Sequence, residues 1–208
     1  KGRKLVNWIR EAAVPYPIDE FPSFSARPKF MEGSKQFSAA EKGTIVHFIL
    51  QHLDLSRAAS EEEMVGQVDE MVKSELLTQE EAQAADLTRI RAFLNSETGR
   101  RIRNAADVRR EVPFNFRKKA DEMIDNLQSN DDTLLIQGVI DCFFEEEGQW
   151  VLLDYKTDYV NSMQKVKELT QRYRIQMDLY TEALEQITGK PVKERILYLL
   201  SINQAINL

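Results

Sequence analysis

A pair of β-rich segments separated by only two residues places the strongest constraint on how this chain can fold. Residues 133–146 and 149–157 are rich in β-branched and aromatic side chains, and Glu147 and Gly148 stand between them. A two-residue connection of this kind is typical of a tight β-hairpin. We therefore expect the two segments to pair as antiparallel strands.

Capping patterns and apolar periodicity predict helices before this hairpin. Ser38, Ser60 and Thr78 are each followed three residues later by a glutamate, which is the pattern of a helix capping box. The signals predict helices over residues 38–53, from residue 60 to about 72, over 78–94 and over 97–104. A change of period then predicts a strand over 108–116.

The remainder of the chain alternates between helix and strand signals. A helix is predicted over residues 162–188, broken or bent near Thr170, and Gly189 to Pro191 form a helix stop. A last long strand is predicted over 194–202, followed by a short return strand. The order of elements predicts an α/β core with a helical N-terminal part.

Four of the six prolines lie in residues 1–37, where the sequence shows little periodicity. This composition is typical of a linker or an extended arm. Residues 38–208 are then one domain, with a helical part over 38–105 and an α/β core over 106–208. Because the chain begins at Lys1, we expect it to be a fragment of a longer protein.

Two aspartates and a lysine lie among apolar residues in the two strands of the predicted hairpin. Side chains two apart share a face of a strand, so Leu152, Asp154 and Lys156 lie on one side, and Asp141 is set among apolar neighbours on the partner strand. Two adjacent buried carboxylates imply a bound cation or a raised pKa. Oxygen ligands with vacant positions suit Mg²⁺ or Mn²⁺. Lys156 would then orient and activate a water and stabilise charge on a phosphate.

The alternative without a function is a solvated Asp–Lys pair at a strand end, because an isolated Asp-x-Lys tripeptide is common.

The distribution of charge along the chain also has two interpretations. The net charge is −6, although residues 100–119 hold eight basic and two acidic side chains. Arg109 and Arg110 of this run are candidate DNA contacts, since basic patches bind phosphates. The alternative is a solvated face.

Composition also excludes several classes of protein. Cys142 is the single cysteine, so an intrachain disulfide and a four-cysteine iron–sulfur or zinc site are both excluded. No apolar run approaches the ~20 residues that span a bilayer, and no signal peptide is evident. We expect a cytoplasmic protein without a membrane partner. No phosphate-binding Gly-x-x-x-x-Gly-Lys loop occurs, so no nucleotide cofactor is expected in this fragment.

The motifs together resemble the PD-(D/E)xK nuclease superfamily, in its RecB-like branch. The resemblance rests on five segments in the order of that branch: Gly43–His47, Arg110–Phe114, Gly138–Asp141, Asp154–Thr157 and Gln176–Tyr180. It implies a restriction-endonuclease-like core, with a mixed central sheet flanked by helices.

The resemblance also implies roles for individual residues. His47, Asp141, Asp154 and the backbone carbonyl of Tyr155 would bind the metal, and Lys156 would be the catalytic lysine. The remaining candidates are Gln176 and Tyr180, which would line the site, and Glu111, whose motif position has a variable metal role. Taken singly, His47 is more often a core histidine, and Gln176 with Tyr180 a half-buried polar pair. Tyr173, on the same helical stripe, would either stack on a base or pack in the core.

Within this branch the sequence is most similar to nuclease domains that end bacterial helicase–nuclease subunits. That likeness implies Mg²⁺-dependent exonucleolytic cleavage of DNA, on single strands fed by an ATP-driven motor, in double-strand break repair and recombination. It implies two partners, a missing helicase part of the same polypeptide and a second helicase–nuclease subunit. The rival hypotheses are an inactive nuclease fold that binds DNA or a partner, and an unrelated α/β domain.

Overall fold

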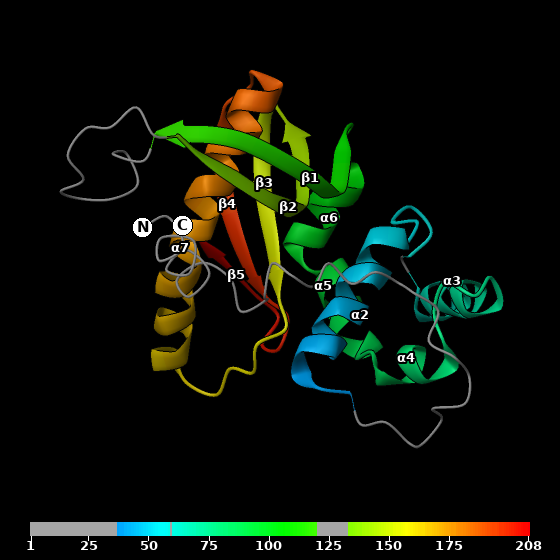
Figure 1. Cartoon of the computed structure of the whole chain (residues 1–208). Helices are drawn as coiled ribbons and strands as arrows, with labels where there is room; N and C mark the ends of the chain where they lie inside the picture. The colour runs from blue at the N-terminus through cyan, green and yellow to red at the C-terminus, as the bar shows by residue number, and fades with distance from the viewer. Residues whose placement is uncertain (1–36, 59, 120–132) are drawn as a thin grey trace.

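The computed structural model describes residues 37–58, 60–119 and 133–208, and within them the chain forms a helix–sheet–helix sandwich (Figure 1). Helices α2 (Ala39–His52), α5 (Leu87–Asn95) and α6 (Glu97–Asn104) cover one face of the sheet, and α7 (Met163–Thr188) covers the other. The predicted linker over residues 1–37 lies, except for its last residue, outside the described part.

The sheet has five strands among the described residues, in the spatial order β1-β2-β3-β4-β5. They are β1 (Val108–Lys119), β2 (Thr133–Glu146), β3 (Gln149–Lys156), β4 (Val192–Leu199) and β5 (Gln204–Asn207). Neighbours pair antiparallel except β3 and β4, which are parallel and are joined through α7. The expected mixed central sheet is confirmed.

The predicted hairpin joins β2 to β3. Glu146 pairs with Gln149, and the two residues between them both have positive φ, 54° at Glu147 and 78° at Gly148. Positive φ at both central residues is the requirement of a type I′ turn, whose twist matches that of paired strands. This turn fixes the register that later aligns the two aspartates.

Capping boxes begin three of the helices, as expected. They are present at Ser38 for α2, at Ser60 for α3 (Glu61–Lys73) and at Thr78 for α4 (Gln79–Ala84). The single helix predicted over residues 78–94 is wrong, because the chain forms α4 and α5 with a break at Ala85. The side chain of Asp86 accepts from the backbone N–H of Arg89 and so begins a new helix.

The second half of the chain follows the predicted order with two differences. Helix α7 is continuous over 26 residues, so the expected break near Thr170 is wrong; the Thr170 hydroxyl donates to the Val166 carbonyl inside the helix. Gly189 ends it in the left-handed conformation, with φ 67°. Strand β4 ends at Leu199 rather than at residue 202, and a turn leads to the short return strand β5.

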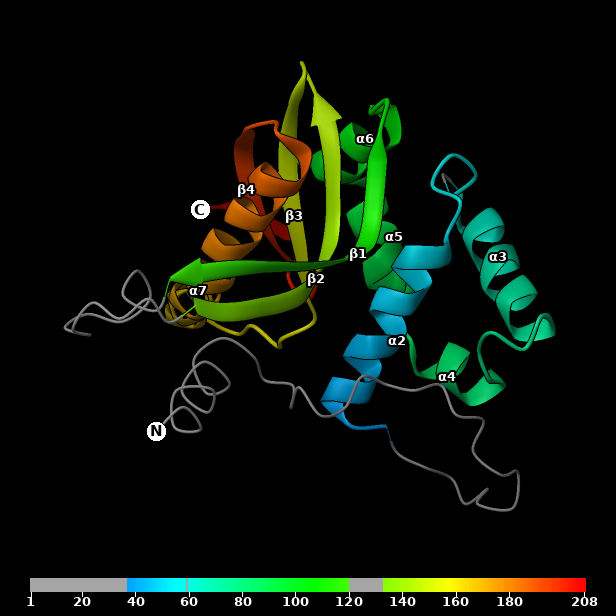
Figure 2. The ribbon, with the colours of Figure 1, turned by 45° about the horizontal axis from the view of Figure 1, so that its top comes forward.

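Two apolar cores lie on the opposite faces of the sheet. The larger is packed between β2–β4 and helices α2 to α6, and includes Ile49, Phe93 and Tyr198. The second lies between the sheet and α7, and includes Phe114, Leu152 and Met177. Helices α3 and α4 lie beyond α2, on the side away from α7 (Figure 2).

In both β1 and β2, the face of the sheet on which even-numbered side chains lie changes at the same point of the ladder. In β1, Arg110 bonds to carbonyls of α2, whereas Phe114 packs on the α7 side. In β2, Cys142 lies in the α2 core, whereas Ile140 lies in the α7 core. Even-numbered side chains therefore swap sides between residues 110 and 112 and between 140 and 142. The register continues through this bend, which places Glu111 opposite Asp141.

Candidate active site

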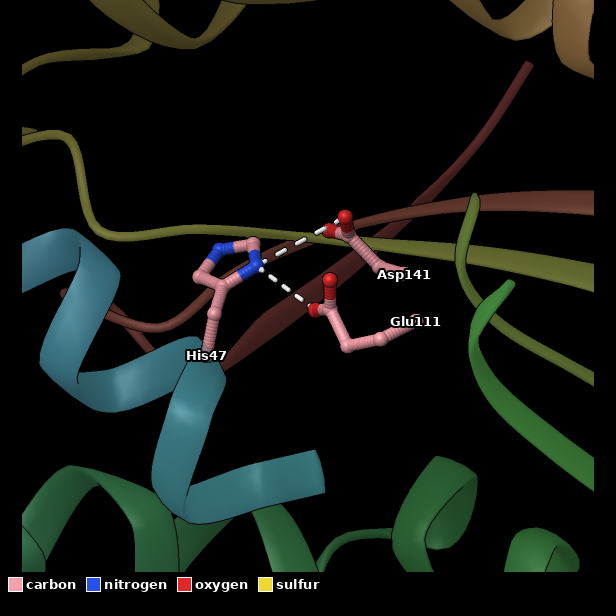
Figure 3. A group of neighbouring side chains, drawn as sticks. All are labelled: His47, Glu111 and Asp141. Carbon is pink, nitrogen blue, oxygen red and sulfur yellow. Dashed lines mark hydrogen bonds and ion pairs between the residues drawn. The ribbon is translucent and has the colours of Figure 1, made fainter. Parts of the chain in front are cut away.

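A histidine and two carboxylates converge where the β1–β2 ladder bends (Figure 3). His47, on α2, points its Nδ1 towards Glu111 Oε1 at 3.4 Å and Asp141 Oδ1 at 3.5 Å. The ligand atoms of the three residues all lie within 4.8 Å of one another, which is the separation expected around one metal ion. Their side chains are partly covered, with 25%, 21% and 10% exposed.

Glu111 reaches this position through an unusual backbone conformation. Its φ is +51°, in the left-handed region that a glutamate inside a strand seldom adopts. Such strain persists only where the surroundings hold it, and it is frequent at functional sites. The structure places Glu111 beside His47, 64 residues away in the chain.

The electrostatics of this group favour positive charge at its centre. Although burial favours the neutral imidazole, the Asp141 and Glu111 carboxylates raise the pKa of His47 to about 10. Burial opposes the charged form of Asp141, but the His47 charge holds the pKa of that carboxyl below its ordinary value. The two carboxylates thus favour a positive charge at His47, as they would favour a divalent cation bound among them.

Asp154 lies next to this group but belongs to a separate contact. It is completely buried, and its Oδ2 forms an ion pair of 2.8 Å with Lys156 Nζ. Among the described residues, neither carboxylate oxygen accepts a hydrogen bond of good geometry. Burial raises the pKa of Asp154 to about 7, with Asp141 adding to the shift and Lys156 opposing it. Despite burial, Asp154 and Asp141 raise the pKa of Lys156, which keeps it an ammonium.

The two aspartates are aligned by the hairpin. Cys142 pairs with Leu153, and these paired residues directly adjoin Asp141 in β2 and Asp154 in β3. Asp141 Oδ2 accepts a hydrogen bond of 2.9 Å from the backbone N–H of Tyr155. The side chain of Tyr155 turns to the opposite core, where its ring packs edge-on against His47 and Phe93. The metal role of the Tyr155 carbonyl stays a prediction.

The ring of Tyr173 packs against the ammonium of Lys156. The Lys156 ammonium lies 4.3 Å from the centre of the Tyr173 ring, and the Tyr173 hydroxyl donates to Asp158 Oδ2 at 3.0 Å. Tyr173 is only 3% exposed. Of its two predicted roles, core packing is the one that this conformation shows, because its ring face is taken by Lys156.

Gln176 and Tyr180 form a pair on α7. Gln176 Nε2 donates to the Tyr180 hydroxyl at 2.6 Å, whereas Gln176 Oε1 is buried and has no hydrogen-bond partner among the described residues. Burial, and then the charges of Asp154 and Asp141, raise the pKa of Tyr180. The charges of both aspartates therefore act on the Tyr180 hydroxyl, and the role of the pair in lining the site stays a prediction.

Most of the basic run between residues 100 and 119 is engaged within the fold. Arg110 Nη1 donates to the carbonyls of Leu50 and Leu53 at 2.7 Å each, which satisfies the C-terminal end of α2. Arg101 pairs with Glu146 and Glu194 across the sheet. Arg109 pairs with Asp107 but keeps 61% of its side chain exposed. The structure thus leaves Arg109, rather than Arg110, available to a phosphate.

Two observations show that the side chains of this site fit a divalent cation. His47, Glu111 and Asp141 supply one imidazole nitrogen and carboxylate oxygens in a single cluster, the only such group among the described residues. Beside it, the second oxygen of the buried Asp154, Oδ1, has no hydrogen-bond partner among the described residues, a costly arrangement that a cation would relieve.

The chain belongs to the PD-(D/E)XK nuclease superfamily, whose family model matches residues 24–205. This match begins inside the segment interpreted as a linker. The fold and the clustered motif residues agree with it. Among the described residues, no helix has the length and apolar character needed to cross a bilayer.

Within that superfamily, the chain is similar to curated relatives that are A subunits of bacterial ATP-dependent helicase/nucleases. The chain is 47% identical over 190 residues to the one from Alkaliphilus metalliredigens, and 45% identical over 190 residues to the one from Alkaliphilus oremlandii. It is 43% identical over 200 residues to the Acetivibrio thermocellus protein. The alignments cover 91%, 91% and 95% of this chain but only 16% of each relative, so the chain spans about one sixth of their length.

Proposed function

We propose that this chain is a divalent-metal-dependent deoxyribonuclease domain that hydrolyses phosphodiester bonds of DNA, with Mg²⁺ as the natural cation and Mn²⁺ as a substitute. The observation that carries the proposal is the cluster of His47, Glu111 and Asp141 within 4.8 Å, next to the buried ion pair of Asp154 and Lys156. A structural ion pair alone would not need a second, converging set of ligands.

The cation would be held by His47, Glu111 and Asp141, with Asp154 and the carbonyl of Tyr155 as neighbouring ligands. A divalent ion bound there supplies Lewis-acid activation of a phosphate oxygen and of a water molecule. The protein's part is to keep the ligands in place. The Tyr155 N–H holds one oxygen of Asp141, which leaves its other oxygen directed at His47.

Lys156 acts in this proposal as a fixed positive charge. Its ammonium is held by Asp154 on one side and by the Tyr173 ring on the other, so it needs little reorganisation when negative charge develops on the phosphate. Gln176 and Tyr180 would contact the DNA or support the ligands, since the unpartnered Gln176 Oε1 offers an acceptor at the site. Exposed Arg109 would contact the phosphate backbone.

The likeness to the A subunits of helicase/nucleases suggests the setting of this activity. We propose exonucleolytic cleavage of a single strand delivered by an ATP-driven helicase part of the same polypeptide, AddA, working with an AddB-like second subunit in double-strand break repair and recombination. A cytoplasmic location in bacteria accords with the bacterial relatives and the unpaired, buried Cys142. Residues 38–208 would be the nuclease domain, and 1–37 the arm towards the motor.

Cleavage of a fluorescently labelled single-stranded oligonucleotide by the full chain, with and without Mg²⁺ or Mn²⁺, tests the proposal. We expect cation-dependent cleavage, abolished by Asp154→Ala and lowered at least 100-fold by Lys156→Ala. Asp69→Ala and Lys167→Ala, at exposed positions on α3 and α7, are matched controls that should keep full activity. Full activity of Asp154→Ala would refute the assignment. Cation-independent DNA binding without cleavage would indicate an inactive binding module.

A further inference from the structure

The loop that follows Lys156 presents an exposed aromatic residue between two anchored neighbours. Tyr159 is 73% exposed, the highest value among the large apolar side chains of the described residues. Before it, Asp158 is held by the Tyr173 hydroxyl at 3.0 Å, and after it Val160 is buried against α7 and β4. Because both neighbours are anchored, the backbone at Tyr159 is held on both sides.

Tyr159 lies close to the proposed point of cleavage. It is the third residue after Lys156, and an extended chain advances at most about 3.6 Å per residue, so their Cα atoms lie within about 11 Å. Tyr173 contacts both Lys156 and Asp158, which ties the loop directly to the catalytic lysine. A strand whose phosphate reached Lys156 would therefore have its neighbouring bases near Tyr159.

The surroundings of Tyr159 leave its ring available. Among the described residues, its ring makes no aromatic contact and its hydroxyl no hydrogen bond, in contrast to Tyr155, Tyr173 and Tyr180 around the same site. Met163, the first residue of α7 and four residues after Tyr159, is 67% exposed. Exposed aromatic side chains are the platforms on which unpaired bases stack.

We propose that Tyr159 is a base-stacking residue that holds a nucleobase of a single DNA strand next to the active site. The inference rests on the proposed nuclease function and adds to it a residue that holds the single strand. A base inside a duplex is already stacked on both faces, so a platform of this kind favours unpaired strands. Base stacking, one of the two alternatives that the sequence left open for Tyr173, falls in this proposal to Tyr159, because Tyr173 is buried and its ring contacts Lys156.

Fluorescence anisotropy of a labelled 20-nucleotide single strand, with the full chain and with Ca²⁺ in place of Mg²⁺ so that the strand persists, tests the proposal. We expect Tyr159→Ala and Tyr159→Leu to weaken binding by about tenfold, because both remove the ring. Tyr159→Phe should bind within twofold of the unaltered chain. Ile187→Ala is a matched control: it is 58% exposed and lies at the opposite end of α7.

An oligonucleotide of abasic residues separates stacking from other contributions. The unaltered chain and Tyr159→Ala should bind it equally, since it has no bases to stack. Equal binding of both proteins to the ordinary strand would overturn the inference, and so would a tenfold loss that persists on the abasic strand. If the unaltered chain neither binds nor cleaves single strands, the proposed function itself fails. Cation-dependent cleavage that is indifferent to Tyr159 rejects the stacking role alone.

Discussion

The backbone N–H of Tyr155 donates to Asp141 Oδ2 at 2.9 Å, so the residue that follows one aspartate of the hairpin holds the carboxylate of the other. This contact fixes one oxygen of Asp141, while its second oxygen lies 3.5 Å from His47 Nδ1. The strand pairing that builds the sheet thereby also orients the site.

Replacing Asp141 with asparagine separates the structural part of this contact from the electrostatic part. The amide oxygen can still accept from Tyr155, so we expect the thermal midpoint to stay within a few degrees. Cleavage should fall at least 100-fold, because one charge is removed from the proposed cation ligands. Asp178→Asn, in an exposed ion pair with Arg195, is the matched control and should cleave normally. Near-normal cleavage by Asp141→Asn would remove this residue from the site.

Tyr173→Leu tests whether the ring beneath Lys156 helps to position it. Loss of the cation–π contact at 4.3 Å should lower kcat by roughly tenfold and leave KM little changed. Tyr173→Phe keeps the ring but not the hydroxyl that holds Asp158, so its kcat should stay near normal. Steady-state kinetics on a single strand supply both constants.

A double-mutant cycle decides whether Tyr173 acts through Lys156. In the Lys156→Ala background, Tyr173→Leu should cause no further loss of the residual rate. An independent tenfold loss in that background would show that Tyr173 matters through packing, and the positioning role would be rejected.

Two helical glycines are predicted to respond to alanine with opposite signs. A Cβ at Gly99 would clash with the Phe93 carbonyl oxygen, where α6 meets α5, whereas a Cβ at Gly66 on α3 has nothing within 4 Å. Gly99→Ala should therefore lower the free energy of unfolding by roughly 1–3 kcal/mol. Gly66→Ala should raise it by about 0.5–1 kcal/mol through helix propensity. Urea unfolding measures both, and the same sign for the two would contradict the close packing at Gly99.

The ion pairs of Arg101 should make stability depend on acid pH. The Arg101 guanidinium holds the pKa of Glu146 below its ordinary value of 4.5. A carboxyl with a lowered folded-state pKa stabilises the fold above that ordinary value and loses this contribution as the pH falls through the lower value. Arg101→Met should thus lower the thermal midpoint at pH 7, and the difference should shrink below pH 4.5. Arg100→Met, at an exposed position, should show neither effect.

Much of the framework could be predicted because its signals are local. The capping boxes at Ser38 and Ser60 and the turn at Glu147 depend on residues a few positions apart. The break between α4 and α5 also has a local signal, the capping residue Asp86. The apolar pattern continues across it and so favours one long helix, which is why the sequence prediction fails there.

The sequence predicts the convergence of His47 with the hairpin aspartates only through the family resemblance, whereas the proximity of Asp154 and Lys156 has a local signal. Asp154 and Lys156 share a strand face, so their proximity follows from period two. The closeness of His47 and Glu111 depends on how α2 packs and on the left-handed conformation of Glu111, neither of which a motif encodes. Arg110 illustrates the same limit, since its guanidinium donates hydrogen bonds to carbonyls at the end of α2 and is not left for DNA. Burial of Tyr173 likewise depends on the loop after β3.

Anomalous diffraction from a crystal of the full chain soaked in Mn²⁺ tests the central claim most directly. The account predicts one strong anomalous peak among the side chains of His47, Glu111 and Asp141, within coordination distance of at least two of them. The same crystal soaked without the cation should lack it. No peak at this place, or a peak only at surface carboxylates, would contradict the claim that these residues build a metal centre.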